Sequence, residues 1–348
     1  MSTVDPREAP GAPPTVEAKV FRLGVLATDG CMMSSIAAAT DTLRVAQTLA
    51  RIRAPNSDLR IEAVVFGARG QSSVRMANGL DLGGLLPPPD DLDMVLVPGL
   101  MHSSPHDLVE RVRALQPEMA LLRELHLRGV AVAATCSGSL LLAETGLLDG
   151  HRATCSWWLA SAFRLHYPDV RLEADAMVVE DGGFLTAGGA SAVQPLLLKL
   201  IARAGGEELA QQTARMLLID TQRQSQAPYV SEALMQKPRN SLSEKAEQFL
   251  QRELHEDLSV GRLAEVCGTS ERSLLRHFRT HLGVTPQAHI QHLRVERAKA
   301  LLETTHLSFE EIVERCGYSD SASFRKLFKR ATATTPGDYR ERYRLRPH

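Results

Sequence analysis

The sequence predicts two domains of different class: a doubly wound α/β domain, followed by an all-α domain built from two copies of one helical unit. Three observations carry this prediction. Short runs that are apolar throughout alternate with helical patterns up to about residue 220, a polar stretch with two prolines follows, and one helical pattern then occurs twice. The length of 348 residues agrees, because a single core rarely grows much beyond about 250 residues.

The domain boundaries follow from composition. The N-terminal stretch carries four prolines and almost no large apolar side chains, so it cannot bury enough surface to fold. The segment TQRQSQAPYVSEALMQKPRNSLS is polar, as expected of an interdomain linker. We therefore predict a disordered tail at 1–18, an α/β domain at 19–222, a linker at 223–243 and a helical domain at 244–348.

Strands and helices alternate through the first domain. Four runs are apolar enough to be buried strands: VFRLGVLA, RIEAVVFGA, DMVLVPGL and VAVAAT. Helical periodicity covers 35–52 and 106–129, and MVVEDGGFLTAGGA is typical of a hairpin that turns at Asp181, Gly182 and Gly183. Further helices close the domain within 193–220. This order predicts a parallel sheet covered on both faces, as in flavodoxin-like folds.

One turn of this domain contains a cysteine. Ligands of doubly wound sheets bind beyond the carboxyl ends of the strands, where 28–35, 99–101 and 135–139 fall. Cys136 follows a predicted strand and precedes a predicted helix, which is where many α/β folds place a nucleophile. Backbone amides at such a turn also form a cradle for a carboxylate. We predict a ligand pocket formed by Ser35, Gly99, Leu100, Cys136, Ser137 and Gly138.

The second domain contains an internal duplication. LSVGRLAEVCGTSERSLLRHFRTHLGVTP recurs as LSFEEIVERCGYSDSASFRKLFKRATATTP. The residues of the second copy that correspond to Leu258 and Gly268 lie 49 positions further along the chain. One residue is then inserted, and the counterparts of Phe278 and Pro286 lie 50 positions further. Each copy has a Ser-led helix, a Cys-Gly break and a second helix that ends in Phe with basic neighbours. This pattern is typical of a helix-turn-helix, whose second helix enters the major groove of DNA.

The second helix of each copy has a basic outward face. Spacing of three to four residues buries Leu274 and Phe278 in the first copy and Phe324, Leu327 and Phe328 in the second. The connecting helix PQAHIQHLRVERAKALLE, about 26 Å long, can hold the two units about 34 Å apart, which is one turn of DNA. Arg279 and Arg330 also remain outside, together with the predicted DNA contacts Arg272, Ser273, Arg276, Ser321, Arg325, Lys326 and Lys329.

Charge and composition favour some function classes over others. The net charge is −1, yet residues 321–348 hold 8 Lys and Arg against 2 Asp and Glu, as expected of a nucleic-acid face, although solvated surfaces also carry such runs. No apolar run approaches the roughly 20 residues that span a bilayer, and no signal-peptide pattern is present, so we expect a cytoplasmic protein without a membrane partner. The five cysteines are far apart in the sequence, which argues against a disulfide framework. The sequence contains no CxxC pair of the kind that binds zinc, and we expect neither a metal nor a cofactor.

Residues 243–343 resemble the AraC/XylS-type DNA-binding domain, through the turn glycines, both Thr-Pro pairs and the stretch GYSDSASFRKLFKRATATTPGDYR. The resemblance implies DNA contacts at Arg272, Ser273, Arg276, Ser321, Arg325 and Lys326. One position departs from the family pattern. Ala333 stands where a glycine usually closes the second recognition helix, so we expect that helix end to be strained or shifted.

Residues 21–229 resemble the DJ-1/PfpI branch of class I glutamine amidotransferase-like domains, in the form fused to AraC-type domains in GlxA-like regulators. TCSGSLLLAETGLLDGHRAT carries the match, with DMVLVPGL, FLTAGGASA and ARMLLIDTQRQSQAPY in family order. The resemblance places Cys136 at the nucleophile position. By this resemblance, Ser35 and Ser137 stand where relatives that use the cysteine have an acid or a base, and Ser156 stands where related regulators often have a histidine. A thiol needs such a partner to become a thiolate.

Three functions are compatible with these residues. The first is a transcription regulator whose non-catalytic α/β domain senses a small metabolite. For it, the resemblance implies a nitrogen-containing effector, a homodimer formed through the α/β domains, and promoter DNA as partner, with RNA polymerase as a further candidate. The second is an amidohydrolase, glyoxalase or deglycase that uses Cys136. The third is a redox sensor that pairs Cys136 with Cys155. Trp157 and Trp158 are expected in packing, with cation binding as the alternative.

Overall fold

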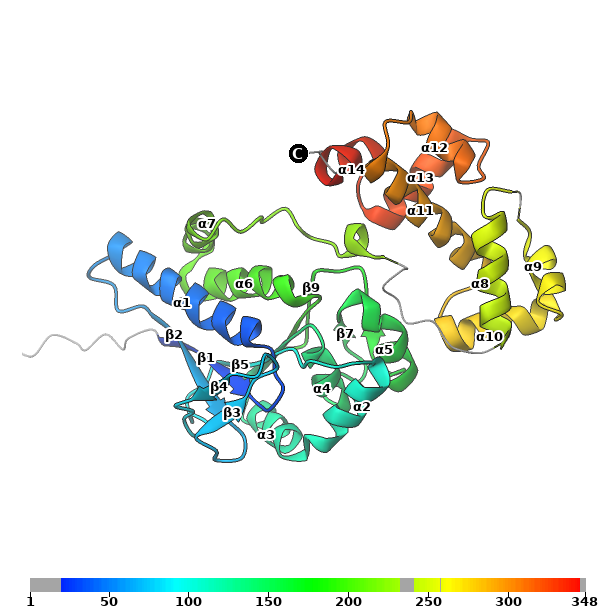
Figure 1. Cartoon of the computed structure of the whole chain (residues 1–348). Coiled ribbons are helices and arrows are strands. Elements are labelled where there is room, and N and C mark those ends of the chain that lie inside the picture. Colours follow the sequence, from blue (N-terminus) through cyan, green and yellow to red (C-terminus); the bar gives the residue numbers. More distant parts are fainter. Residues whose placement is uncertain (1–19, 232–240, 257, 345–348) are drawn as a thin grey trace, which may run out of the picture.

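The computed structural model describes residues 20–231, 241–256 and 258–344, which form the two predicted domains (Figure 1). The predicted tail at 1–18 and the linker residues 232–240 lie outside the described residues. Within the described part of the chain, no helix is long and apolar enough to cross a membrane. The same residues contain no group of three or more His, Cys, Asp and Glu side chains placed to hold a metal ion.

A six-stranded sheet forms the centre of the first domain. Its spatial order is β2 (Arg60–Gly67), β1 (Val20–Ala27), β5 (Met94–Val97), β6 (Ala131–Thr135), β10 (Phe184–Ala187) and β9 (Val178–Asp181). The first five strands are parallel, and β9 runs antiparallel to β10 as the predicted hairpin. This is the flavodoxin-like order with an antiparallel strand added at one edge, so the predicted fold class is confirmed.

Helices cover both faces of the sheet. α1 (Met33–Arg53), α6 (Val193–Gly205) and α7 (Glu207–Met216) pack together on one face, and α3 (Gln116–Leu127) and α4 (Gly138–Glu144) lie on the other (Figure 1). α2 (Pro105–Ala114) packs on α4, and α5 (Ala160–His166) on the short 3-10 helix η1 (Trp157–Leu159). The helix expected over 106–129 is divided at Leu115 between α2 and α3, because Pro117 in the first turn of α3 has no N–H to continue the helix.

Four short strands and a further 3-10 helix were not predicted. They form the pairs β3 (Ser73–Arg75) with β4 (Asp81–Gly83) and β7 (Arg152–Ala153) with β8 (Arg171–Leu172), and the helix η2 (Ala190–Ala192). Strands of two or three residues are too short to show a hydrophobic period in the sequence.

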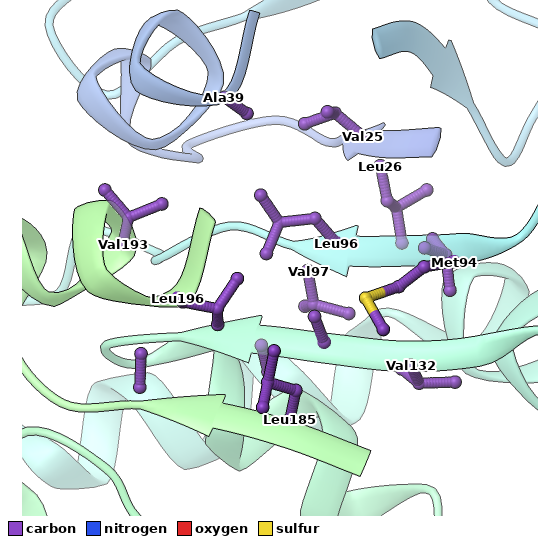
Figure 2. Packing of buried hydrophobic residues seen from close by; sticks show 14 of the residues in the cluster. Val25, Leu26, Ala39, Met94, Leu96, Val97, Val132, Leu185, Val193 and Leu196 are labelled. Carbon is purple, nitrogen blue, oxygen red and sulfur yellow. The ribbon is translucent and has the colours of Figure 1, made fainter. Parts of the chain in front are cut away.

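The sheet is buried on both sides, which explains its apolar strands. Every residue of β5 and of β10 is buried. Figure 2 shows Leu96 of β5 lying between strand β1 and helix α6, with Val25 and Leu196 nearby. All three side chains are fully buried. A close-packed interior of this kind holds the carboxyl ends of β1, β5 and β6 in fixed positions for a site.

The second domain consists of helices α8 (Ser241–Glu253), α9 (Val260–Val266), α10 (Glu271–Leu282), α11 (Pro286–Thr304), α12 (Phe309–Arg315), α13 (Ser321–Thr332) and α14 (Pro336–Tyr343). α9 with α10 and α12 with α13 are the duplicated unit, and α11 connects them. Each unit has its own small core, one around Phe278 and one around Phe324 and Phe328. The turn glycines Gly268 and Gly317 have φ of 65° and 74°, values that glycine adopts without strain.

The second recognition helix, α13, ends under strain, as the presence of alanine in place of the family glycine at position 333 predicts. Ala333 has φ of 58°, in the left-handed region, whereas Gly283 takes the equivalent position after α10 with φ of 70°. A side chain in this conformation costs roughly 1–2 kcal/mol.

We expect Ala333→Gly to stabilise the helical domain by about 1 kcal/mol, because the relief of strain exceeds the extra entropy of glycine in the unfolded chain. The opposite exchange, Gly283→Ala, should destabilise it by a similar amount. Thermal unfolding followed by circular dichroism at 222 nm checks both. A lower melting temperature for Ala333→Gly would contradict the assignment of strain to this residue.

Part of the predicted linker is packed. The 3-10 helix η3 (Ala227–Tyr229) lies within it, and Gln226, Pro228 and Val230 are buried. The polar composition of the stretch did not reveal this, because the side-chain amide of Gln226 is buried by forming hydrogen bonds to the backbone of the α/β domain.

Candidate functional site

Cys136 occupies a sharp turn between β6 and α4. Its φ of 56° lies in the left-handed region, which is uncommon for a residue other than glycine. Its backbone N–H donates to the carbonyl of Ala187, at the end of β10, over 2.9 Å. The turn therefore has the strained strand-to-helix geometry of a nucleophile elbow, held in place by the neighbouring strand.

The structure brings together all six residues of the predicted pocket. The Ser35 hydroxyl accepts from the Gly99 amide over 3.4 Å. The Ser137 hydroxyl accepts from the Leu100 amide over 2.7 Å and donates to the Leu100 carbonyl over 2.8 Å. All six residues, including Cys136 and Gly138, are buried. Their assignment to a ligand stays a prediction, and the structure shows them closed.

Several of these residues also hold the turn itself together. Ser35 and Ser137 use their hydroxyls on the loop that follows β5. Gly138 is required for close approach: a Cβ there would lie 2.4 Å from the carbonyl oxygen of Pro98 and 2.8 Å from that of Val97. The polar atom left at the centre of the turn is the sulfur of Cys136.

The partner of this sulfur is a hydroxyl. Ser156 Oγ lies 3.0 Å from Cys136 Sγ and donates to it, and Ser156 is fully buried. A serine hydroxyl cannot take the thiol proton near neutral pH, so it is not a general base. Among the described residues, no histidine hydrogen-bonds to Cys136. The ring of His102, which lies in the loop after β5, is 3.0 Å from the Leu100 carbonyl through Nδ1.

Cys155 is a poor redox partner. It is fully buried, and its sulfur faces the carbonyl of Ser156 at 3.4 Å. Burial raises the pKa of the Cys155 thiol, which disfavours the thiolate that disulfide exchange requires. All five cysteines are free thiols in the structure.

Two further features lie near the turn: a buried hydroxyl, which the sequence did not reveal, and a tryptophan pair, which the sequence expects in packing. The hydroxyl of Ser139 is buried and has no hydrogen-bond partner among the described residues, which is rare for a buried polar group. The rings of Trp157 and Trp158 meet edge to face with centroids 5.3 Å apart, and Trp158 lies beside Gly189, just after β10. No sequence pattern signals the buried Ser139 hydroxyl, because its burial depends on packing between distant segments.

An open groove of about 1030 Å³ lies elsewhere on the domain. It is lined by Met177 and Val178 at the start of β9, by α6 and α7, and by residues 218–224, and by none of the six predicted pocket residues. The groove and the Cys136 turn are therefore separate features.

The predicted DNA-binding faces are exposed on α10 and α13. Leu274, Phe278, Phe324 and Phe328 are buried as predicted, and Leu327 is partly buried. Two of the predicted DNA contacts, Ser273 and Ser321, are partly buried. The other five are exposed: Arg272, Arg276, Arg325, Lys326 and Lys329. Arg325 lies over the Phe309 ring at 4.5 Å and pairs with Glu310 at 3.9 Å. Direct contact of these residues with DNA stays a prediction.

An α/β domain with a flavodoxin-like strand order, joined to two helix-turn-helix units, defines the class of DNA-binding regulators with an N-terminal α/β domain. Residues 263–342 match the family model of a helix-turn-helix domain, and residues 85–203 match that of the DJ-1/PfpI family. The chain is 33% identical to the HTH-type transcriptional regulator CdhR of Pseudomonas aeruginosa over 66% of this chain and 69% of that one. It is 29% identical to the HTH-type transcriptional regulator GlxA of Rhizobium meliloti over 93% and 96%.

Among solved structures, the AraC family transcriptional regulator from Pseudomonas putida is similar, at 22% identity with a TM-score of 0.46 over 57% of this chain and 99% of that one. The chain belongs to the AraC family of helix-turn-helix transcriptional regulators that carry an N-terminal DJ-1/PfpI domain. Its C-terminal domain binds DNA, and the relatives named above are transcriptional regulators rather than enzymes.

Proposed function

We propose that the α/β domain is a non-catalytic receptor for a small metabolite that binds against the Cys136 turn, and that its occupancy controls binding of promoter DNA by the helical domain. The observation that carries this proposal is the pair formed by Cys136 and Ser156. The strained elbow is retained, but its thiol is bonded to a hydroxyl in place of a base. A preformed turn without a base can bind a ligand and cannot readily turn it over.

The features around the turn favour a nitrogen-containing effector, the class that the family resemblance implies. Trp157 and Trp158 place two aromatic rings beside Ser156, and aromatic rings attract cationic groups. The buried hydroxyl of Ser139 has no partner among the described residues, and a ligand that opens the turn would supply one. We further propose a homodimer through the α/β domains, which places four recognition helices in one assembly.

The test is a thermal-shift screen of the full chain against amino acids and quaternary amines. A ligand at 100 times its Kd raises the free energy of unfolding by about 2.7 kcal/mol, and so the melting temperature. We expect a stabilising compound whose effect on transcription persists in Cys136→Ser, as it does in the control Cys267→Ser in the helical domain. If the transcriptional response is lost only in Cys136→Ser and the parent protein turns the compound over, the enzyme function is supported instead. If no compound changes the melting temperature, the receptor function is contradicted.

For DNA, we expect Arg276→Ala to cost about 1–3 kcal/mol on a duplex selected from a random pool, because a base-edge contact is lost. Lys329→Ala should weaken selected and scrambled duplexes alike and reduce the salt slope by about one unit, as loss of a phosphate contact does. Fluorescence anisotropy across a salt series measures both. Unchanged affinity of Arg276→Ala would remove that assignment, and a selected site without a repeated half-site would count against the homodimer.

A further inference from the structure

One short segment contacts both domains. Residues 222–231, called here the bridging segment, leave the α/β domain after α7 and contain η3 (Figure 1). Figure 1 shows this yellow-green stretch passing over α6 toward the helical domain. Only three residues separate Gln226, which is held by the first domain, from Val230, which is held by the second. So short a connection leaves little slack between the two attachments.

The attachment to the α/β domain is the side chain of Gln226, which is 2% exposed. Its Nε2 donates to the carbonyl of Cys155 at 2.9 Å and to that of Ala174 at 3.0 Å. Its Oε1 accepts from the Trp157 amide at 3.3 Å. Cys155 and Trp157 flank Ser156, the residue bonded to Cys136. The amide of Gln226 therefore holds the backbone on both sides of the Cys136 partner.

The same amide packs against the strand end that holds Cys136. A Cβ placed on Gly188 would lie 2.2 Å from Cδ of Gln226. Gly188 follows Ala187, whose carbonyl accepts from the Cys136 amide. Cys136 is 3% exposed and Ser156 is fully buried. A ligand that reaches this sulfur must therefore move part of its wall, and Gln226 is bonded to that wall.

The attachment to the helical domain is made by buried and aromatic groups. Lys299 on α11 is 6% exposed, and its Nζ donates to the Val230 carbonyl and pairs with Glu296 at 2.8 Å. The ring of Tyr229 meets that of Tyr343 edge to face, with centroids 5.8 Å apart. η3 also lies against α13, the second recognition helix.

We propose that the bridging segment couples the Cys136 site to the helical domain, with the Gln226 amide as the contact that changes when the site opens. The proposal rests on the proposed receptor function, whose ligand would open this site. Opening the wall at residues 155–157 releases Gln226, and the segment then frees the helical domain from its attachment at Lys299. Coupling of this kind is reciprocal, so loosening the segment at the helical domain must also open the site.

The reciprocal effect can be measured without a known ligand or operator. The full chain is treated with iodoacetamide, and the alkylation rate of each cysteine is followed by site-resolved mass spectrometry. We expect Lys299→Met and Tyr229→Ala, both changes in contacts with the helical domain, to raise the Cys136 rate by about tenfold. The rate of Cys31, fully buried in the same domain, should not change. Arg297→Met on α11, which has no hydrogen bond or ion pair among the described residues, is the matched control.

An unchanged Cys136 rate in both variants would overturn the coupling, and so would a parallel rise at Cys31, which indicates general loosening of the domain. If Lys299→Met fails to fold by circular dichroism, Tyr229→Ala decides, because that ring is 36% exposed and its loss is tolerable. Failure of the receptor function is distinguishable. If no compound binds but the Cys136 alkylation rate rises in the variants, the coupling is supported and the receptor function is not. If a compound binds but the Cys136 rate does not change, the receptor function is supported and the coupling is overturned.

Discussion

Replacing Gly138 with alanine is expected to destabilise the α/β domain by about 3 kcal/mol, because the new Cβ has no space. It would lie 2.4 Å from the carbonyl oxygen of Pro98 and 2.8 Å from that of Val97. Both atoms belong to the backbone, so no side-chain rotation relieves the collision. The start of α4 must move away from the loop after β5, and Cys136, two residues earlier, moves with it.

Urea unfolding followed by tryptophan fluorescence measures this effect. The chain has two tryptophans, Trp157 and Trp158, and both lie in the α/β domain. Gly83→Ala is the matched control, because no atom lies within 4 Å of a Cβ at Gly83 and its φ is not in the left-handed region. The control should change the free energy of unfolding by no more than about 0.5 kcal/mol. Equal stability of the two variants would show that the turn tolerates a wider separation of α4 from β5.

Arg294→Ala is expected to destabilise the helical domain by about 3 kcal/mol and to weaken operator binding. Arg294 is 6% exposed, and its guanidinium donates to the carbonyls of Leu254 at 3.2 Å and Glu256 at 2.6 Å. It also lies 5.0 Å from the ring centroid of Tyr318. Its loss leaves two carbonyls unsatisfied, at about 1–3 kcal/mol each where they are buried, and removes packing.

The position of Arg294 explains why DNA binding should suffer. Leu254 and Glu256 precede the first helix-turn-helix unit, and Tyr318 lies at the turn of the second. Arg294 therefore fixes the relative position of the two units, and two units that bind together gain affinity from their linkage. We expect a loss of about tenfold or more on a selected duplex. Arg297→Ala, on the same helix, removes the same charge and should keep the melting temperature by circular dichroism. Similar losses in both variants would show that charge alone matters.

Much of the fold could be predicted from local pattern. The strands VFRLGVLA and VAVAAT, the hairpin at Gly182 and the duplicated helical unit appear where the sequence places them. The apolar runs predict the strands because a parallel sheet is buried on both faces, so its strands tolerate almost no polar residue. Helix caps add local signals, as Ser308 and Glu311 show by forming a complete capping box.

The candidate site was only partly predictable. Cys136 and Gly138 stood out because strand-to-helix turns have a recognisable pattern. The role of Gln226 was missed, since a glutamine in a polar stretch looks like any solvated residue. Its five partners lie on segments that are 50 to 72 residues away in the chain. Only the folded chain brings these four backbone groups and the Thr154 hydroxyl to one amide.

By itself, the sequence determined the two domain classes, the buried faces of α10 and α13 and the strained end at Ala333, because each depends on residues that are neighbours along a helix or strand. It also determined the family, because the motifs and their order lie in the chain itself. Tertiary structure alone decided that the Cys136 sulfur is bonded to Ser156, that the turn is closed, and that Gln226 and Arg294 hold separate units together. Those outcomes depend on hydrogen bonds between distant segments, and such bonds form only after packing has excluded water and left the polar groups a single set of partners.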